Sequence, residues 1–181
     1  MKALYPMRGV ITTVNTPFNE DLTINWSDLR RTAEAALEAG VSGFLAPCFA
    51  SEIDELTNEE RYRMVTELLT VTHQAGHGIV MPNVRGKTKD DCVEQAKRYL
   101  DLGVDGVNIF MPTVTEESYR ELVAAVDDLH PPFLCLQDTK DNELRAPFVK
   151  SMFDEFESFR CIKIETANPG PDYTAILKAT D

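Results

Sequence analysis

The sequence predicts an α/β fold made of repeated strand–helix units, and three observations support this prediction. Short apolar runs alternate with longer amphipathic segments along the chain. The apolar runs begin about every 27 to 35 residues, which is the length of one strand–helix unit. No low-complexity segment or linker divides the 181 residues, so we expect a single domain. The predicted strands are residues 9–14, 43–46, 79–81, 107–110, 133–136 and 161–165.

Each predicted strand is followed by a segment with helix start or stop signals. Ser27 can cap a helix that ends at Gly40. Thr57 and Glu60 form the pattern of a capping box at the start of a long helix. Pro171 favours the start of a last helix, because proline is common in the first helical turn. Three further helices are predicted to begin at Thr88, Thr115 and Ala146.

Two architectures agree with six such units. One is an open parallel α/β sheet with helices on both faces, which is complete at this length. The other is a TIM barrel, which has eight units and about 250 residues. A barrel would therefore lack roughly its last two units. The unit pattern alone slightly favours the open sheet.

Composition excludes several classes of partner. The chain carries 30 acidic and 18 basic residues, a net charge of −12, so it is a poor ligand for nucleic acid. No apolar run approaches the roughly 18 residues of a membrane span, and the first residues contain no secretory signal. The four cysteines are widely spaced and no histidine–carboxylate cluster is present. We therefore expect a cytoplasmic protein with reduced thiols and no metal.

The most informative residue is Lys163, in the sixth predicted strand. Strand side chains alternate between faces, so Lys163 and Glu165 share one face while Ile162 and Ile164 share the other. The isoleucine face is expected to pack on helices. A neutral lysine amine in such a place is the group that Schiff-base chemistry on a carbonyl substrate requires. A structural Lys163–Glu165 ion pair explains the pattern equally well.

Four groups of residues, in order along the chain, resemble the dihydrodipicolinate synthase / N-acetylneuraminate lyase family. The resemblance runs from Arg8 to about Leu177 and is fairly specific because the order of the groups is kept. The matching groups are Thr16–Pro17–Phe18, then Ser51–Glu52 with Leu56–Arg61, then Gly103–Val107 with Pro112, and finally Ile162–Glu165.

The resemblance implies the architecture and the class of reaction. The family fold is a TIM barrel, so residues 1–181 would be a single partial barrel domain of about six units. The family consists of class I lyases and aldolases, which act on pyruvate or another 2-keto acid through a lysine imine and use no further cofactor. Family members commonly form homo-oligomers, so self-association is expected as well.

The resemblance also assigns catalytic roles. Lys163 matches the lysine that forms the imine. The family's proton-shuttling tyrosine on the fifth strand is replaced by Leu136, and its tyrosine after the fourth strand is absent. Glu165 could serve as the acid/base group, or it could only pair with Lys163. Asp138 could transfer protons, although a carboxylate after a strand is more often a turn or cap residue.

The substrate-binding positions depart from the family pattern. The family's Gly-Thr-Thr-Gly-Glu loop grips the substrate carboxylate, and the same place here is Cys48–Glu52. The loss of both glycines predicts a strained loop if their positive φ angles are kept. Because so many family groups are replaced, a non-catalytic family member that acts as a small-ligand-binding or regulatory barrel remains the alternative. The candidate binding residues are Thr16, Phe49, Ala50, Ser51 and Gln137, with Asn83 and Asn108 bonding either substrate or backbone.

Overall fold

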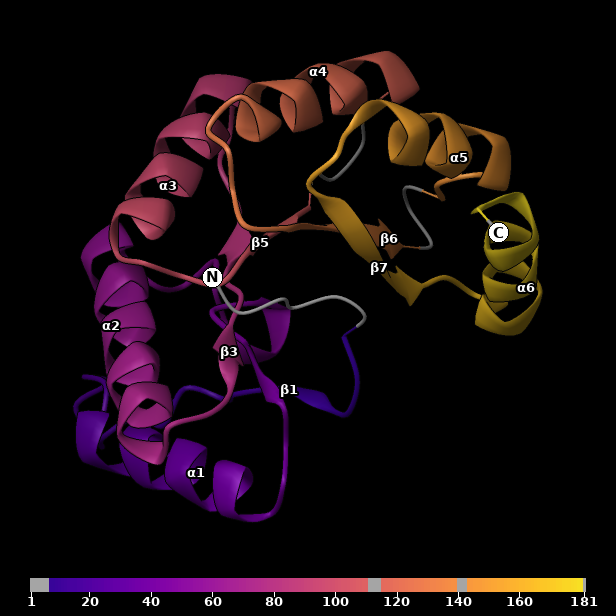
Figure 1. Ribbon diagram of the computed structural model, residues 1–181. Coiled ribbons are helices and arrows are strands. Elements are labelled where there is room, and N and C mark those ends of the chain that lie inside the picture. Colours follow the sequence, from indigo (N-terminus) through magenta and orange to yellow (C-terminus); the bar gives the residue numbers. More distant parts are fainter. Residues whose placement is uncertain (1–6, 111–114, 140–142, 181) are drawn as a thin grey trace. The chain divides into compact units, whose positions relative to one another are not determined.

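The computed structural model describes residues 7–110, 115–139 and 143–180 (Figure 1). The chain divides into two compact units, and each is built around its own parallel sheet. The first unit comprises residues 1–83 with 98–105, and the second comprises residues 84–97 with 106–181. The organisation of residues 1–181 as a single domain stays a prediction.

The first unit contains a three-stranded parallel sheet in the order β1-β2-β3. Its strands are β1 (Ile11–Thr13), β2 (Gly43–Leu45) and β3 (Ile79–Val80). Its helices are α1 (Trp26–Glu38) and α2 (Asn58–Ala75), with a short 3-10 turn, η1 (Phe49–Ser51), between β2 and α2. These elements match the predicted ones, with shorter strands than the apolar runs suggested.

The helix ends show which sequence signals determine them. Thr57 caps α2 as predicted, since its hydroxyl accepts from the amide of Glu60 and the Glu60 carboxylate accepts from the amide of Thr57. The predicted cap at Ser27 is wrong. Asn25 caps α1 instead, because its side-chain oxygen accepts from the amide of Asp28 at 3.0 Å. An asparagine is as good a cap as a serine, and it comes first along the chain.

The second unit contains a four-stranded sheet in the order β4-β5-β6-β7. Its strands are β4 (Asn83–Val84), β5 (Val107–Ile109), β6 (Leu134–Thr139) and β7 (Phe159–Glu165). Its helices are α4 (Glu116–Asp127), α5 (Ala146–Glu155) and α6 (Pro169–Thr180), while α3 (Lys89–Asp101) continues from this unit into the first. The apolar run predicted as one strand at 79–81 is therefore followed by a separate strand that belongs to the other sheet.

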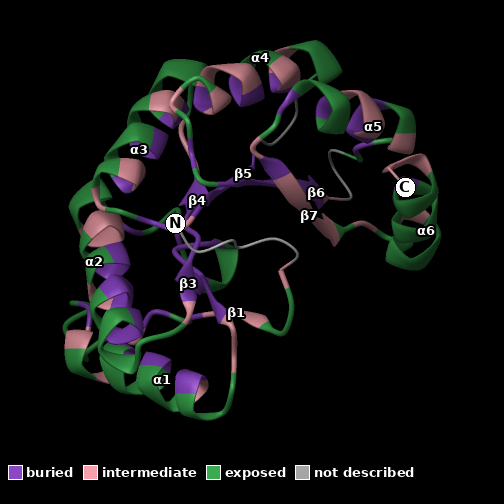
Figure 2. Ribbon diagram, in the orientation of Figure 1, coloured by how far each residue is buried: buried purple, intermediate pink, exposed green. Residues whose placement is uncertain are grey.

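The core of the second unit lies between one face of its sheet and helices α4 and α5. Figure 2 shows buried residues on the strands and on the sides of these helices that face them. Burial of each large apolar side chain contributes about 1.5 to 3 kcal/mol to stability. The core residues that α4 and α5 supply are Tyr119, Leu122, Val123, Val126, Phe148, Val149 and Met152.

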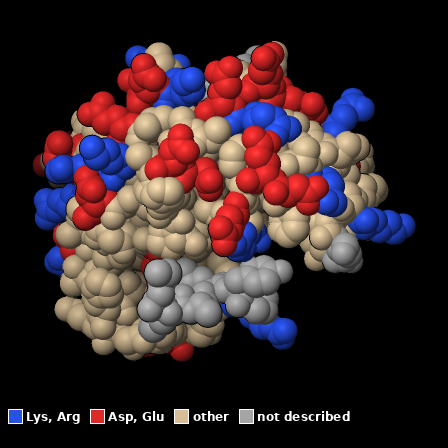
Figure 3. Space-filling model, turned by 45° about the horizontal axis from the view of Figure 1, so that its top comes forward, with Lys and Arg blue, Asp and Glu red and all other residues tan. Residues whose placement is uncertain are grey.

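Acidic residues outnumber basic ones by 30 to 18, which gives the net charge of −12. Acidic side chains outnumber basic ones on the face drawn in Figure 3. Among the described residues, no helix is both long enough and apolar enough to cross a bilayer.

A glycine in β2 gives the clearest test of the first sheet. Gly43 has a φ of +152°, and a methyl group there would lie 2.3 Å from the carbonyl oxygen of Ile79 in the neighbouring strand. We expect Gly43→Ala to lower the free energy of unfolding by about 2 kcal/mol or more, because backbone would have to move. Denaturant titration measures the loss.

Gly170 in α6 is the matched control. No heavy atom lies within 4 Å of a methyl group added there, and its φ is not in the left-handed region. Gly170→Ala should leave stability unchanged or raise it by up to about 1 kcal/mol. Equal losses in the two variants would contradict the close approach of β2 and β3.

Candidate active site

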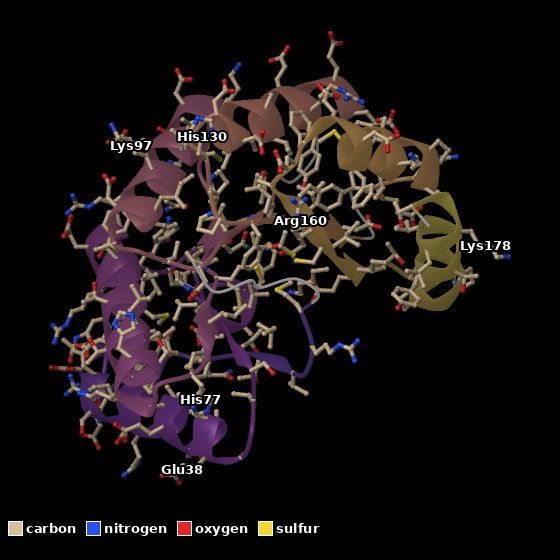
Figure 4. The ribbon with its side chains drawn as sticks, in the orientation of Figure 1. Glu38, His77, Lys97, His130, Arg160 and Lys178 are labelled. Atoms are coloured by element: carbon tan, nitrogen blue, oxygen red, sulfur yellow. The ribbon has the colours of Figure 1, made fainter. Side chains whose placement is uncertain are left out.

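The face on which Lys163 lies is set by an irregularity in the pairing of β6 with β7. Leu134 pairs with Phe159 and the next residue, Cys135, pairs with Cys161, so Arg160 is an extra residue in β7 (Figure 4). Such a bulge shifts the alternation of side chains by one position. Leu134 and Phe159 therefore face the helices, and Phe159 contacts the ring of Phe153 on α5. Beyond the bulge, Lys163 pairs with Gln137 and lies on the opposite face, which we call the inner face.

A row of polar side chains crosses the inner face. Asn108 on β5 donates from Nδ2 to Oε1 of Gln137 on β6, at 2.7 Å. Gln137 donates from Nε2 to Oε2 of Glu165 on β7, at 2.8 Å. The same oxygen of Glu165 lies 3.1 Å from Nζ of Lys163. Three adjacent strands thus bring together Lys163, Glu165 and Gln137, as predicted, and also Asn108; we call these four residues the polar row.

The polar row has a buried end and an accessible end. The side chains of Asn108 and Gln137 are fully buried. The side chain of Lys163 is 26% exposed and that of Glu165 is 51% exposed. A small molecule can therefore reach the amine and the carboxylate, whereas the two amides lie beneath them.

Two thiols lie next to the polar row. Cys135 and Cys161 are paired residues of β6 and β7, and they come two positions before Gln137 and Lys163, so they share the inner face. A hydrogen bond with Cys161, together with burial, raises the pKa of the Cys135 thiol well above its usual value. Cys135 is buried while Cys161 is partly exposed, and neither thiol forms a disulfide.

Two residues considered in the sequence analysis lie on the helix-facing side of β6. Leu136 pairs with Ile162, and Asp138 pairs with Ile164, so both point away from Lys163. Leu136 is therefore not placed where a proton shuttle for Lys163 would lie. Asp138 accepts a hydrogen bond from the amide of Leu144 at 2.8 Å. This geometry favours a structural role for Asp138 over the proton-transfer role that the sequence allowed.

The loop after β2, in the first unit, uses its own hydroxyl groups internally. Ser51 is fully buried, and its hydroxyl donates to the carbonyl of Val14 at 2.6 Å while accepting from the amide of Cys48 at 3.2 Å. Thr16, also buried, donates from its hydroxyl to the carbonyl of Ser51 at 2.6 Å. These contacts tie the loop to the segment after β1. They occupy the hydroxyls that we expected to hold substrate.

The expectation of strain from the lost glycines is wrong for this loop. Cys48, in the place of the first glycine, has a φ of −150°, and Ser51, in the place of the second, is not among the residues with positive φ. The left-handed residue is Glu52, with a φ of 55°. Phe49 and Ala50, which lie between Cys48 and Ser51, are exposed and remain candidates for contact with a ligand.

No tyrosine takes the place of the family's proton shuttle on the described part of the inner face. Tyr119 on α4 is fully buried, and its hydroxyl donates to the carbonyl of Ile109 at 2.7 Å. Burial raises the pKa of Tyr119 far above its usual value, so the hydroxyl stays protonated. Pro112 and its neighbours, which replace the family's second tyrosine position, lie outside the described residues. Within the described ranges, no three His, Cys, Asp or Glu side chains form a group that could hold a metal ion.

Comparison with known sequences identifies the family. A sequence model of the Dihydrodipicolinate synthetase family matches residues 6–129, which is more than half of the chain. The chain therefore belongs to the dihydrodipicolinate synthetase family. It is 29% identical over 122 residues to a 4-hydroxy-tetrahydrodipicolinate synthase of Salinibacter ruber, covering 67% of this chain and 40% of that protein. It is 27% identical over 163 residues to an uncharacterised DapA-like lyase of Thermococcus kodakarensis, covering 87% of this chain and 54% of that protein.

Solved structures of the family share the fold. Dihydrodipicolinate synthase of Aquifex aeolicus superposes with a TM-score of 0.86 at 19% identity, covering 96% of this chain and 60% of that one. The chloride-inhibited enzyme of Acinetobacter baumannii, complexed with pyruvate, gives a TM-score of 0.86 at 20% identity with the same coverages. The fold is therefore an incomplete TIM barrel of about six units, and the open-sheet alternative is not needed. The chain spans about 40 to 60% of the length of these relatives.

Asp138 should make stability depend on pH. Burial raises the pKa of Asp138 from 3.8 to about 6, against the opposite influence of its hydrogen bond from Leu144. Between about pH 4 and 6 the folded state thus binds more protons than the unfolded state, so stability falls as pH rises through this window. A shift of this size corresponds to at most about 3 kcal/mol.

The variant Asp138→Asn removes the titrating group but keeps an oxygen that can accept from Leu144. We expect its stability, measured by denaturant titration, to lack the loss that the original protein shows between about pH 4 and 6. Parallel pH profiles for the two proteins would show that burial of Asp138 has no such effect.

Cys161 should be the first thiol to react with an alkylating reagent. It is the one cysteine of the four that is not buried, and reaction requires access as well as the thiolate. Iodoacetamide should modify Cys161 at least about tenfold faster than Cys48, Cys92 and Cys135, as followed by peptide mass mapping on the folded protein. Similar rates at all four sites would contradict the described burial.

Proposed function

We propose that the protein is a Schiff-base-forming lyase, of aldolase or dehydratase type, that acts on pyruvate or another 2-keto acid through Lys163. The observation that carries this proposal is the position of the Lys163 amine. It lies on the inner face of β7, is partly exposed, and is 3.1 Å from the Glu165 carboxylate. Membership of the dihydrodipicolinate synthetase family and the pyruvate complex of the Acinetobacter baumannii relative support the choice of substrate class.

The chemistry follows from these two groups. The neutral amine of Lys163 attacks the ketone carbon, and the resulting carbinolamine loses its hydroxyl group as water to give the imine. The protonated imine then accepts the electron pair released when a bond to the adjacent carbon breaks. No further cofactor is needed for these steps, because the imine itself is the electron sink.

Glu165 is the group best placed to move protons in this site. It contacts Lys163 directly, and its half-exposed side chain can exchange protons with water. It can take a proton from the lysine ammonium before attack and protonate the departing hydroxyl afterwards. We therefore assign to Glu165 the acid/base role for which the family uses a tyrosine.

Substrate contacts are proposed for fewer residues than the sequence suggested. The hydroxyls of Ser51 and Thr16 are occupied by contacts within the loop. Phe49 and Ala50 are exposed in the same loop, and their assignment to substrate rests on the family pattern alone. Gln137 is buried and bonded at both ends of its amide, which makes it a poor direct ligand of substrate.

A second function is favoured by a separate observation. The hydroxyls of Thr16 and Ser51 bond within their own unit, and Leu136 lies on the helix-facing side of β6. Several groups that the family uses in its reaction therefore have no counterpart among the described residues. A family member of this kind could bind a small 2-keto acid without converting it. The two functions differ in whether Lys163 forms a covalent adduct.

Trapping with borohydride separates these functions. Incubation with pyruvate and sodium borohydride should reduce the imine and leave a stable adduct on Lys163, found by peptide mass mapping. Lys163→Arg should abolish the adduct, because arginine keeps the charge but cannot form the imine. Circular dichroism should show that both proteins are folded.

The experiment should also be done on a completed barrel. The chain can be joined to the part of the Thermococcus kodakarensis relative that it does not cover, since it covers 54% of that protein. An adduct on Lys163 in either protein supports the lyase. Two folded proteins that form no adduct with pyruvate or with larger 2-keto acids would overturn it and favour the binding function.

A further inference from the structure

We propose that Asn108 and Gln137 are positioning residues that hold the Glu165 carboxylate beside the Lys163 amine. This inference rests on the proposed function and extends it to two buried amides. The family resemblance assigns no such role to Asn108. The contacts that carry the proposal are the three successive contacts of the polar row.

The first argument is the direction of the hydrogen bonds. An ionised carboxylate only accepts hydrogen bonds, so the group that faces Glu165 must be the Nε2 of Gln137. The Oε1 of Gln137 then points the other way and needs a donor. Asn108 supplies that donor from Nδ2, at 2.7 Å. Each amide has one orientation that satisfies its neighbour, and the charge of Glu165 selects that orientation for both.

The second argument is burial. Both amides are fully excluded from solvent, where a polar group without a partner costs roughly 1 to 3 kcal/mol. Gln137 cannot turn over without facing the carboxylate with its own oxygen. Its position is therefore fixed by packing and by bonds at both ends. A fixed amide is a better anchor for Glu165 than water would be.

The third argument is what the row leaves unsatisfied. With Nδ2 given to Gln137, the Oδ1 of Asn108 is buried and has no hydrogen-bond partner among the described residues. Val107 and Ile109 on either side of it are apolar and face the helices, so Asn108 is the residue of β5 that places a buried polar group on the inner face. The cost of a buried oxygen is understandable if the amide is needed to orient Gln137. A buried water molecule would satisfy it.

The consequence concerns Glu165, which is half exposed and would otherwise sample several rotamers. Gln137 and Lys163 both contact its Oε2. The other oxygen remains available to exchange protons with water or substrate. The row thus keeps the acid/base group at the amine through repeated turnovers.

The variant Asn108→Asp tests this directly, because it replaces the donor by an acceptor of the same shape. Gln137 can then satisfy the new carboxylate only by turning its Nε2 away from Glu165, which leaves Glu165 facing an oxygen. We expect the saturating rate of borohydride trapping with pyruvate to fall at least about tenfold. The pyruvate concentration for half-maximal trapping should change by less than about twofold, because neither amide touches the substrate.

Gln95→Glu is the matched control. Gln95 is a buried glutamine of the same unit, outside the polar row, and its side-chain oxygen accepts from the amide of Arg85. A glutamate can still accept that bond. The change from amide to carboxylate is the same as in Asn108→Asp, so general damage to the unit would slow trapping in both variants. The proposal requires that only Asn108→Asp is slow.

A second measurement does not depend on imine formation. Acetic anhydride acylates lysine amines, and an amine in contact with a carboxylate, as Lys163 is at 3.1 Å, is less open to the reagent than one without that contact. In Asn108→Asp, acylation of Lys163 should become at least about threefold faster relative to Lys178, an exposed reference in α6. Unfolding would raise this ratio too, because Lys178 is already exposed while Lys163 is partly covered, so circular dichroism must first show that the variant is as folded as the original protein.

The two readouts separate this proposal from the proposed function. Faster acylation of Lys163 in Asn108→Asp, in a protein that never forms an adduct, would support the positioning role and reject the lyase. Unchanged acylation together with unchanged trapping would overturn the positioning role and leave the lyase standing. Equal effects in Asn108→Asp and Gln95→Glu would also overturn it.

Discussion

The pairing of β6 with β7 is the constraint on which the candidate site depends. Regular alternation would place Lys163 on the same side as Phe159, against the helices. The extra residue Arg160 shifts the pairing by one, so that Lys163 pairs with Gln137 on the inner face. The hydrogen bond from Gln137 to Glu165 follows from that shift, and it connects the β5–β6 bond of Asn108 to the contact between Glu165 and Lys163. This one bulge therefore decides whether Lys163 lies on the accessible inner face or is buried against the helices.

The sequence predicts much of the fold because its signals are local. Alternation within one strand puts Lys163 and Glu165 together, and their contact at 3.1 Å confirms it. Apolar runs and caps such as Thr57 place most helices and strands correctly. The relation between two strands is different, because it depends on register. Nothing in residues 133–139 alone says that Gln137, and not Leu136 or Asp138, shares a face with Lys163.

The substrate loop shows a second limit of sequence reasoning. Matching positions to a family pattern suggested that Ser51 offers a hydroxyl and that lost glycines leave strain. The structure instead buries Ser51 as an internal tie to Val14 and places the left-handed residue at Glu52. Several family residues are replaced together in this loop, and its hydroxyl groups now hydrogen-bond to the protein's own backbone. Such a compensation involves contacts between distant segments, and a single sequence does not display them.

The measurement that tests this account most directly is a crystal structure of the chain after reduction with pyruvate and borohydride. The account predicts continuous electron density from Nζ of Lys163 into a pyruvate-derived group on the inner face, with Glu165 still bonded to Gln137. The bulge at Arg160 should remain. A structure in which Lys163 carries no added group and faces the helices would contradict the central claim.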